Sequence, residues 1–168
     1  RRFHLAPVPL PGGDLAVRKP ARMVLSYLLA AGVDVEDSTL APVAYLTTAE
    51  AQAVSHQART GFNAPLTSSM GRLFDAVAAL IGLCEEISYE AQAAMALESA
   101  VDPQESGFYE IPLENDVINP FPMIRAIVAD LKTGVSEGTI AARFHNSLVW
   151  MSVAACRQIR QETDLHTV

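Results

Sequence analysis

The amino-acid sequence predicts a mainly α-helical protein with a few short β-strands, folded as a single domain over residues 1–168. Apolar residues recur at intervals of three and four along most of the chain, which is the period of one α-helical face. Segments that resemble strands are short and lie at residues 3–10 and 107–113. Half of the residues are hydrophobic and 18% are charged, a composition that excludes intrinsic disorder.

The first quarter of the chain predicts a strand, a turn and a helix. Residues 3–10 form the strand and residues 11–14, which include two glycines, form the turn. Pro20 stands near the first turn of the helix, where a missing N–H costs little, and Gly32 ends it. The core face of this helix comprises Met23, Val24, Tyr27, Leu28 and Ala31. Residues 33–46 predict a loop.

Two helices are expected in the middle of the chain. Thr47 and Glu50 have the spacing of a capping box, which begins an alanine-rich helix that ends near Arg59. Residues 60–65 predict a turn. The side chains of Thr67, Ser68 and Ser69 are available to cap the next helix, which runs to about Leu83.

The second half predicts a helix at residues 89–101, a strand at 107–113 and two further helices. Asn119 caps the first of these, with Pro120 at its start, and Gly134 ends it. The last helix spans about residues 136–162, with an apolar stripe made of Ile140, Phe144, Leu148, Met151, Ala155 and Ile159. Residues 165–168 resemble the start of another strand. Because a sheet of two or three short strands is only marginally stable, we expect both ends to be cuts through a larger sheet.

Charge and composition exclude several functions. A net charge of −7 without a basic face argues against binding nucleic acid. No run approaches the length of a membrane span, and no secretory segment follows residues 1–4. The two cysteines, Cys84 and Cys156, are far apart, and the four histidines are scattered, so we expect free thiols in a cytoplasmic protein and no metal ligands.

One helix carries an unusual stripe of small residues around a carboxylate. On a helical wheel this stripe comprises Ser68, Gly71, Asp75, Ala78 and Gly82, opposite the apolar face. A ligand could lie along it, with Asp75 accepting hydrogen bonds from the vicinal hydroxyls of a ribose and the helix N-terminus facing anionic groups. Alternatively, another helix packs in this groove and Asp75 is merely solvated. Spacing alone favours packing, because most amphipathic patterns reflect packing.

Three other features admit a structural explanation beside a functional one. Ser88 is suited to cap a helix with Glu90 in its first turn. His145 shares a helix side with Val149, Ser152 and Cys156, which favours a hydrogen-bonded core histidine over an acid–base group. The turn at residues 11–14 could bind phosphate through converging N–H groups, although tight connectors use the same residues more often.

Four of these segments together resemble a known family. They are residues 9–14 (Pro-Leu-Pro-Gly-Gly-Asp), residues 63–80 with their core Thr-Ser-Ser-Met-Gly-Arg-Leu-Phe-Asp, residues 88–90 (Ser-Tyr-Glu) and residues 144–146 (Phe-His-Asn). Their order and spacing are similar to the carboxy-terminal region of the HypF family of hydrogenase-maturation carbamoyltransferases, and the similarity runs over nearly the whole chain.

The resemblance implies a reaction, a fold and partners. HypF-like proteins use carbamoyl phosphate and ATP to make carbamoyl-adenylate, and then carbamoylate the C-terminal cysteine of the partner HypE to prepare the cyanide ligand of [NiFe]-hydrogenase. The transfer domain resembles the actin/Hsp70/sugar-kinase superfamily and the tRNA threonylcarbamoyl transferases. This chain is therefore expected to be the helical subdomain of a truncated actin/Hsp70-like α/β transferase domain, forming one wall of the adenylate site.

The resemblance also implies a set of site residues. In the related proteins a Gly-x-x-Phe-Asp helix faces the nucleotide ribose, which corresponds here to Gly71, Phe74 and Asp75 and makes Asp75 the ribose ligand. This implication reverses the preference for packing. The full set implied for nucleotide and carbamoyl-adenylate comprises Asn63, Ser68, Ser69, Gly71, Arg72, Asp75, Glu90, His145 and Asn146. No catalytic residue is assigned.

The sequence departs from the family pattern in ways that bear on activity. The family's histidine-rich metal motif and Asp-Gly-x-Gly strand belong upstream of residue 1, and its Ser-Gly-Gly and Asn-Asp-Gly-Gly segments belong downstream of residue 168. Metal ligands are therefore expected outside this chain, and the chain alone is expected to be inactive. Ala91 stands where the family pattern has glycine. The alternative function is a non-catalytic interaction or scaffold module with the same helical fold.

Overall fold

The computed structural model describes residues 3–35, 40–163 and 167. The helices are α1 (Asp14–Arg18), α2 (Pro20–Ala30), α3 (Ala41–Tyr45), α4 (Thr48–Thr60), α5 (Met70–Leu80), α6 (Gln92–Ser99), α7 (Phe121–Lys132) and α8 (Glu137–Thr163). The strands are β1 (His4–Leu5), β2 (Val8–Pro9), β3 (Leu66–Thr67), β4 (Leu113–Glu114) and β5 (Val117–Ile118). The expectation of a mainly α-helical chain with a few short strands is confirmed.

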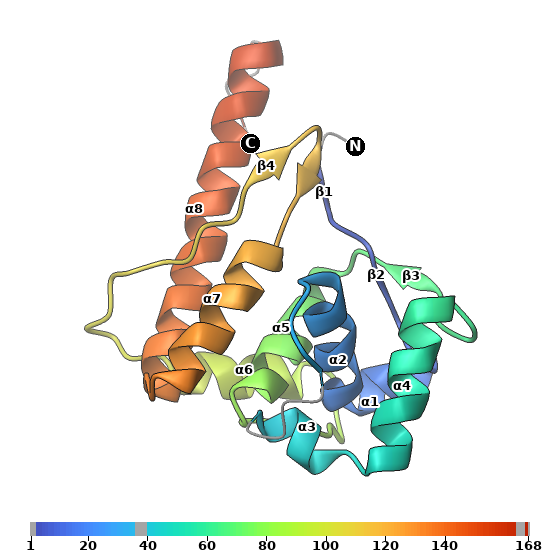
Figure 1. Ribbon diagram of the computed structural model, residues 1–168. Coiled ribbons are helices and arrows are strands. Elements are labelled where there is room, and N and C mark those ends of the chain that lie inside the picture. The colour runs from blue at the N-terminus through green and yellow to red at the C-terminus, as the bar shows by residue number, and fades with distance from the viewer. Residues whose placement is uncertain (1–2, 36–39, 164–166, 168) are drawn as a thin grey trace.

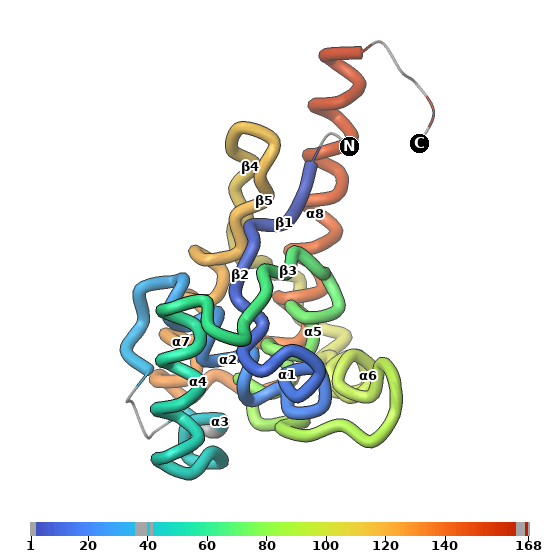
Figure 2. Tube along the Cα trace, turned by 90° about the vertical axis from the view of Figure 1, so that its right-hand side faces the viewer, coloured from blue at the N-terminus to red at the C-terminus, as the bar shows by residue number. Residues whose placement is uncertain are grey.

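Helix α2 is the centre of the helical body. All of its residues from Pro20 to Leu28 are buried, and α1, α3, α4, α5 and α7 all pack against it. Helix α5 also contacts α6, and α7 contacts α8. Helix α8 continues past this body and rises beside the strands, as both views show (Figures 1 and 2). The core is thus a bundle around α2 with α8 along one side.

The strands form two small sheets. Strand β5 pairs in parallel with β1 and antiparallel with β4, with His4 opposite Val117, while β2 pairs antiparallel with β3. The predicted strand at residues 3–10 is therefore two short strands in different sheets. Between them Pro7 offers no N–H to a ladder, whereas the Ala6 N–H donates to the Ile118 carbonyl over 2.9 Å.

The β4–β5 hairpin corrects the expected strand at residues 107–113. Pairing begins only at Leu113, and residues 107–112 carry no strand. The hairpin turns at Asn115 and Asp116, whose φ angles of 48° and 69° match the two positive values of a type I′ turn. The expected strand at residues 165–168 falls largely outside the described residues.

Helix boundaries follow local sequence features where those features exist. The Thr47–Glu50 capping box is present, and positive φ angles at Gly32 and Gly134 end α2 and α7. The Asn119 side chain accepts the Phe121 N–H over 3.1 Å, as expected of a cap. The chain nevertheless contains two helices that were not predicted, α1 and α3, so the loop expected at residues 33–46 is wrong for 41–45. Each has five residues, too few for a periodic pattern.

Two predicted helices are shorter than expected. Helix α5 ends at Leu80 rather than near Leu83, where Gly82 adopts a φ of 81°. Helix α6 covers only Gln92–Ser99 rather than 89–101, and Ser88 is not its N-cap. Instead, the Ser88 N–H and hydroxyl both donate to Gln92 Oε1, over 2.7 and 3.1 Å. This contact stabilises the loop before α6.

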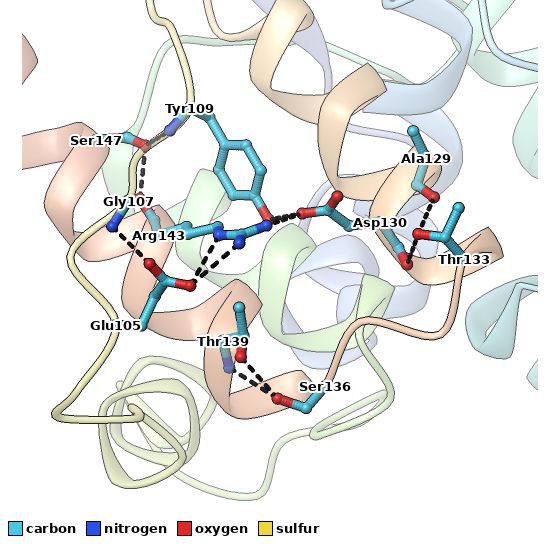
Figure 3. A network of polar contacts seen from close by, with 10 residues as sticks. All are labelled: Glu105, Gly107, Tyr109, Ala129, Asp130, Thr133, Ser136, Thr139, Arg143 and Ser147. Carbon is cyan, nitrogen blue, oxygen red and sulfur yellow. Dashed lines mark hydrogen bonds and ion pairs between the residues drawn. The ribbon is translucent and has the colours of Figure 1, made fainter.

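Residues 102–112, which we call the strap, connect α6 to β4 along α7 and α8. Arg143 of α8 forms ion pairs with Glu105 of the strap (3.1 Å) and Asp130 of α7 (2.8 Å). The Tyr109 hydroxyl donates to the same Asp130 carboxylate over 2.7 Å (Figure 3). Ser147 accepts the Tyr109 N–H over 2.7 Å and donates to the Arg143 carbonyl. A segment without regular structure is thereby held by side chains of two helices.

Removing the Ser147 hydroxyl tests this attachment. Ser147 is buried, so Ser147→Ala leaves the buried Tyr109 N–H without its acceptor, and we expect a loss of about 1–3 kcal/mol in the free energy of unfolding. Ser152 lies on the same helix but is exposed, so Ser152→Ala should change stability by less than about 0.5 kcal/mol. Urea unfolding of both variants measures the difference, and equal stabilities would contradict the assigned role.

Candidate functional site

The first turn of α5 is positioned by the loop and strand before it. β3 pairs with β2, and the Thr67 hydroxyl accepts the Ser69 N–H over 3.2 Å. Ser69 is the N-cap residue, as expected, but its side chain makes no capping hydrogen bond. Asn63 adopts a φ of 48°, and its carbonyl accepts the Gly12 N–H over 2.8 Å. Asn63, Ser68, Ser69 and Gly71 are all exposed around this helix end.

Asp75 lies one turn further along α5 and is buried, with 3% of its surface exposed. Arg72 Nη2 lies 2.9 Å from Asp75 Oδ2, in an ion pair whose alignment makes no hydrogen bond. Burial raises the pKa of the Asp75 carboxyl, and the Arg72 guanidinium offsets only part of that effect. The interpretation of Asp75 as merely solvated is therefore wrong.

The small-residue stripe is not one continuous groove. Ser68, Gly71 and Gly82 are exposed, whereas Asp75 and Ala78 in its middle are buried. Every residue of α5 from Asp75 to Leu80 is buried, because α2 and α6 both pack against this helix. Only the N-terminal end of α5 is open to a ligand.

A cavity of about 630 Å³ lies beside the N-terminal end of α5, and two of the predicted site residues line it. Its lining comes from α1, the first turn of α5 and the segment before α6, and comprises Val17, Arg18, Arg72, Glu86, Ile87, Ser88, Tyr89, Glu90 and Ala91. Arg72 and Glu90 thus meet at one pocket, whose volume is typical of small-molecule sites. Figure 2 shows the segment between α5 and α6 running beside α1.

Backbone contacts hold the two sides of this pocket together. The Ile87 N–H donates to the Arg18 carbonyl over 2.8 Å, and the Ala21 N–H donates to the Glu85 carbonyl over 3.3 Å. Sequence reasoning missed Arg18, because it belongs to a one-turn helix and its neighbour in the pocket is about seventy residues away in the chain. Only this long-range contact reveals its position.

His145 and Asn146 lie apart from the pocket lining. The Phe74 ring of α5 meets the rings of Phe144 and His145 edge to face, at centroid distances of 4.9 and 5.7 Å. His145 Nδ1 donates to the Ala141 carbonyl over 2.8 Å, the hydrogen-bonded setting that its helix neighbours indicated. The Asn146 amide donates to the Glu105 and Gly107 carbonyls, so this side chain holds the strap.

The N–H groups of the glycine turn at residues 11–14 donate hydrogen bonds within the protein. Gly12 donates to the Asn63 carbonyl and Gly13 to the Leu10 carbonyl, over 2.8 and 3.0 Å. Buried Arg22 donates from Nε to the Pro11 carbonyl over 3.0 Å. These contacts support the connector interpretation rather than a phosphate-binding turn.

Within the described part of the chain, no cluster of three or more metal-ligating side chains is found. A search of the same residues finds no helix with the length and apolar character needed to cross a membrane. Cys84 and Cys156 are free thiols.

Burial of Asp75 predicts a distinctive pH dependence. Because its pKa is raised, the folded state binds this proton more tightly than the unfolded chain does. Between about pH 3.9, the ordinary aspartate value, and the raised pKa, stability falls as pH rises, by at most about 1.4 kcal/mol per unit. The loss persists above the raised pKa.

Urea unfolding of the wild type and Asp75→Asn over a pH series measures this effect. The stability of the wild type relative to the variant should decline across that window, and the subtraction removes contributions from other carboxylates. A difference that stays constant with pH would contradict the raised pKa.

Ala91 adopts a φ of 64°, a left-handed conformation that glycine accepts without strain. We expect Ala91→Gly to stabilise the protein by up to about 1 kcal/mol, because relief of strain exceeds the added entropy of the unfolded chain. Ala94→Gly, inside α6, should instead destabilise it by about 1 kcal/mol. Thermal unfolding compares the two, and destabilisation by both would show that Ala91 is not strained.

Comparisons with known proteins agree with this architecture. A family model described as "Carbamoyltransferase, Kae1-like Domain, second subdomain" matches residues 1–168. Carbamoyltransferase HypF of Rhodobacter capsulatus is 39% identical over 157 residues, which cover 92% of this chain and 20% of that protein. The Synechocystis carbamoyltransferase HypF is 32% identical over 176 residues, covering 94% of this chain and 23% of that protein.

Solved structures of HypF have the same fold. A full-length HypF in its phosphate- and nucleotide-bound form is 36% identical, with a TM-score of 0.88 over 98% of this chain and 22% of that one. The HypF of T. kodakarensis is 28% identical, with a TM-score of 0.80 over 96% of this chain and 22% of that one. The chain spans less than a quarter of the length of these four relatives. It belongs to the HypF family of carbamoyltransferases and corresponds to the second subdomain of their Kae1-like domain.

Proposed function

We propose that this chain supplies one wall of the nucleotide site of a carbamoyltransferase. The complete reaction would use carbamoyl phosphate and ATP, pass through carbamoyl-adenylate and carbamoylate the C-terminal cysteine of a HypE-like partner for [NiFe]-hydrogenase maturation. Family membership supports the carbamoyl transfer, and the relative with a TM-score of 0.88 is a nucleotide-bound protein. In this proposal the chain acts in the cytoplasm, where its thiols remain reduced.

The observation that carries the proposal is the pocket at the first turn of α5. Arg72 lines it from this turn, Glu90 lines it from the segment before α6, and Asp75 holds the Arg72 guanidinium at 2.9 Å. Ser69 and Gly71 are exposed beside it, at a helix end that attracts anionic groups. A ligand in this pocket would meet hydrogen-bonding groups from two segments of the chain.

Asp75 is proposed to receive the ribose hydroxyls. Its Oδ2 atom has no hydrogen-bond partner, and an unused carboxylate acceptor favours a hydroxyl donor. Because this oxygen is buried beside Arg72, ligand entry requires the Arg72 side chain to shift. The chain contributes binding groups only. The metal ligands of the family are expected outside this chain and no catalytic residue is assigned within it, so we expect the isolated chain to be inactive.

Calorimetric titration of this chain with ATP and AMP tests this proposal. We expect saturable binding that Asp75→Ala weakens by at least about tenfold, because a hydrogen bond to a charged group contributes roughly 1.5–3 kcal/mol. Asp14→Ala, at an exposed aspartate of α1, is the matched control and should bind as the wild type does. Circular dichroism checks that each variant is folded. Equal affinities for all three proteins would remove Asp75 from the site.

A further inference from the structure

Two buried oxygen atoms on neighbouring helices lack hydrogen-bond partners in the described part of the chain. One is the hydroxyl of Tyr27 on α2, a residue that is 1% exposed, and the other is Oδ2 of Asp75 on α5. Helices α2 and α5 pack against each other. A hydroxyl can donate a hydrogen bond and an ionised carboxylate can only accept one, so the two groups are complementary. Because an unpaired polar group in a core is costly, both call for an explanation.

The Tyr27 hydroxyl lies within electrostatic range of the Arg72–Asp75 ion pair. Burial raises the pKa of this hydroxyl, the Arg72 guanidinium lowers it and the Asp75 carboxylate raises it. Packing holds the tyrosine in this position, because every residue of α2 from Pro20 to Leu28 is buried. Any change in the contacts of Asp75 therefore takes place near a fixed hydroxyl.

Arg72 is the partner that a ligand would remove from Asp75. Its guanidinium lies 2.9 Å from Asp75 Oδ2, and the same side chain lines the pocket and is 20% exposed. An anionic ligand in that pocket competes for this guanidinium. The Asp75 carboxylate would then be buried without its compensating charge, and a buried ion in that state needs another hydrogen-bond donor.

Tyr27 is the donor that remains for Asp75 after this exchange. Burial, the Glu85 carboxylate and the Asp75 carboxylate all raise the pKa of the Cys84 thiol, so this thiol is also within range of Asp75. The thiol, however, already donates to the Glu86 carbonyl, over 3.5 Å. The Tyr27 hydroxyl is within the same range and has no acceptor among the described residues.

We propose that Tyr27 is a positioning residue for Asp75: when a ligand draws Arg72 away, the Tyr27 hydroxyl donates to the Asp75 carboxylate and fixes its orientation. The tyrosine touches no ligand and acts only through the aspartate. This role rests on the proposed nucleotide site, and it accounts for the unpaired hydroxyl in the core. A phenylalanine at position 27 would fill the same space in the ligand-free protein without the cost of that unpaired group.

A double-mutant cycle tests this role by titration of AMP into the complete polypeptide in which these residues occur. We expect Tyr27→Phe to weaken AMP binding by about five- to tenfold when Asp75 is present. In the Asp75→Ala background the same substitution should have no effect, because the group that Tyr27 positions is gone. A tyrosine that only supports the fold would weaken binding equally in both backgrounds.

Amide hydrogen exchange of the ligand-free proteins separates positioning from folding. Tyr27→Phe should leave the protection of the α2 and α5 amides equal to that of the wild type or higher, because the lost hydroxyl has no partner. Tyr109→Phe is the matched control, since this buried tyrosine does donate, to Asp130 over 2.7 Å. It should lower protection in the strap and leave the affinity for AMP unchanged.

Three outcomes overturn the inference. If Asp75→Ala weakens AMP binding and Tyr27→Phe does not, Tyr27 has no positioning role while the proposed nucleotide site stands. If Tyr27→Phe lowers the protection of α2 and α5, or weakens binding equally in both backgrounds, the role of the tyrosine is structural. If the wild type binds no nucleotide, both proposals fall.

Discussion

The burial of α2 from Pro20 to Leu28 is the constraint on which the rest of this structure depends. Polar side chains in a buried segment usually find hydrogen-bond partners within the protein. Arg22 and Ser26 do so by donating to the Pro11 and Pro9 carbonyls, over 3.0 and 2.6 Å. These two hydrogen bonds attach β2 and the glycine turn to the core. The polar groups of α2 therefore help to hold the turn that precedes α1.

Packing of α5 against α2 has two opposing effects on stability at the candidate site. The α5 face is built from alanines that allow close approach, but the same burial takes Asp75 out of water. The Arg72 guanidinium, in the first turn of α5, offsets part of the cost of burying the Asp75 carboxylate. The cost that is not offset raises the pKa of Asp75. The buried Tyr27 hydroxyl of α2 also lacks a hydrogen-bond partner in the described chain. The Arg72 guanidinium lowers the pKa of both groups against the effect of burial, so these two unsatisfied oxygens lie near the same positive charge.

The sequence predicted the elements whose determinants are local. The Thr47–Glu50 capping box and the glycines at positions 32 and 134 set helix ends through neighbouring residues alone. The prediction of a strand at residues 107–113 was wrong, because alternating apolar and polar residues do not distinguish a strand from an irregular segment bound by Asn146 and Ser147. The spacing of residues in the sequence was sufficient to place Arg72 and Asp75 on one helix. The burial of Asp75 could not be predicted from spacing, because it depends on the packing of α2 and α6 against α5. The position of Arg18 at the pocket could not be predicted either, because it depends on the hydrogen bond from the Ile87 N–H to the Arg18 carbonyl.

The Phe-His-Asn motif of α8 connects two regions of the chain. Phe144 and His145 contact Phe74 of α5, while Asn146 donates to the Glu105 and Gly107 carbonyls of the strap. Each amide hydrogen bond of this kind contributes roughly 1 kcal/mol, so Asn146 stabilises the position of the strap on α8. Here one face of the motif supports the helix that carries Asp75, and the other holds the strap on α8.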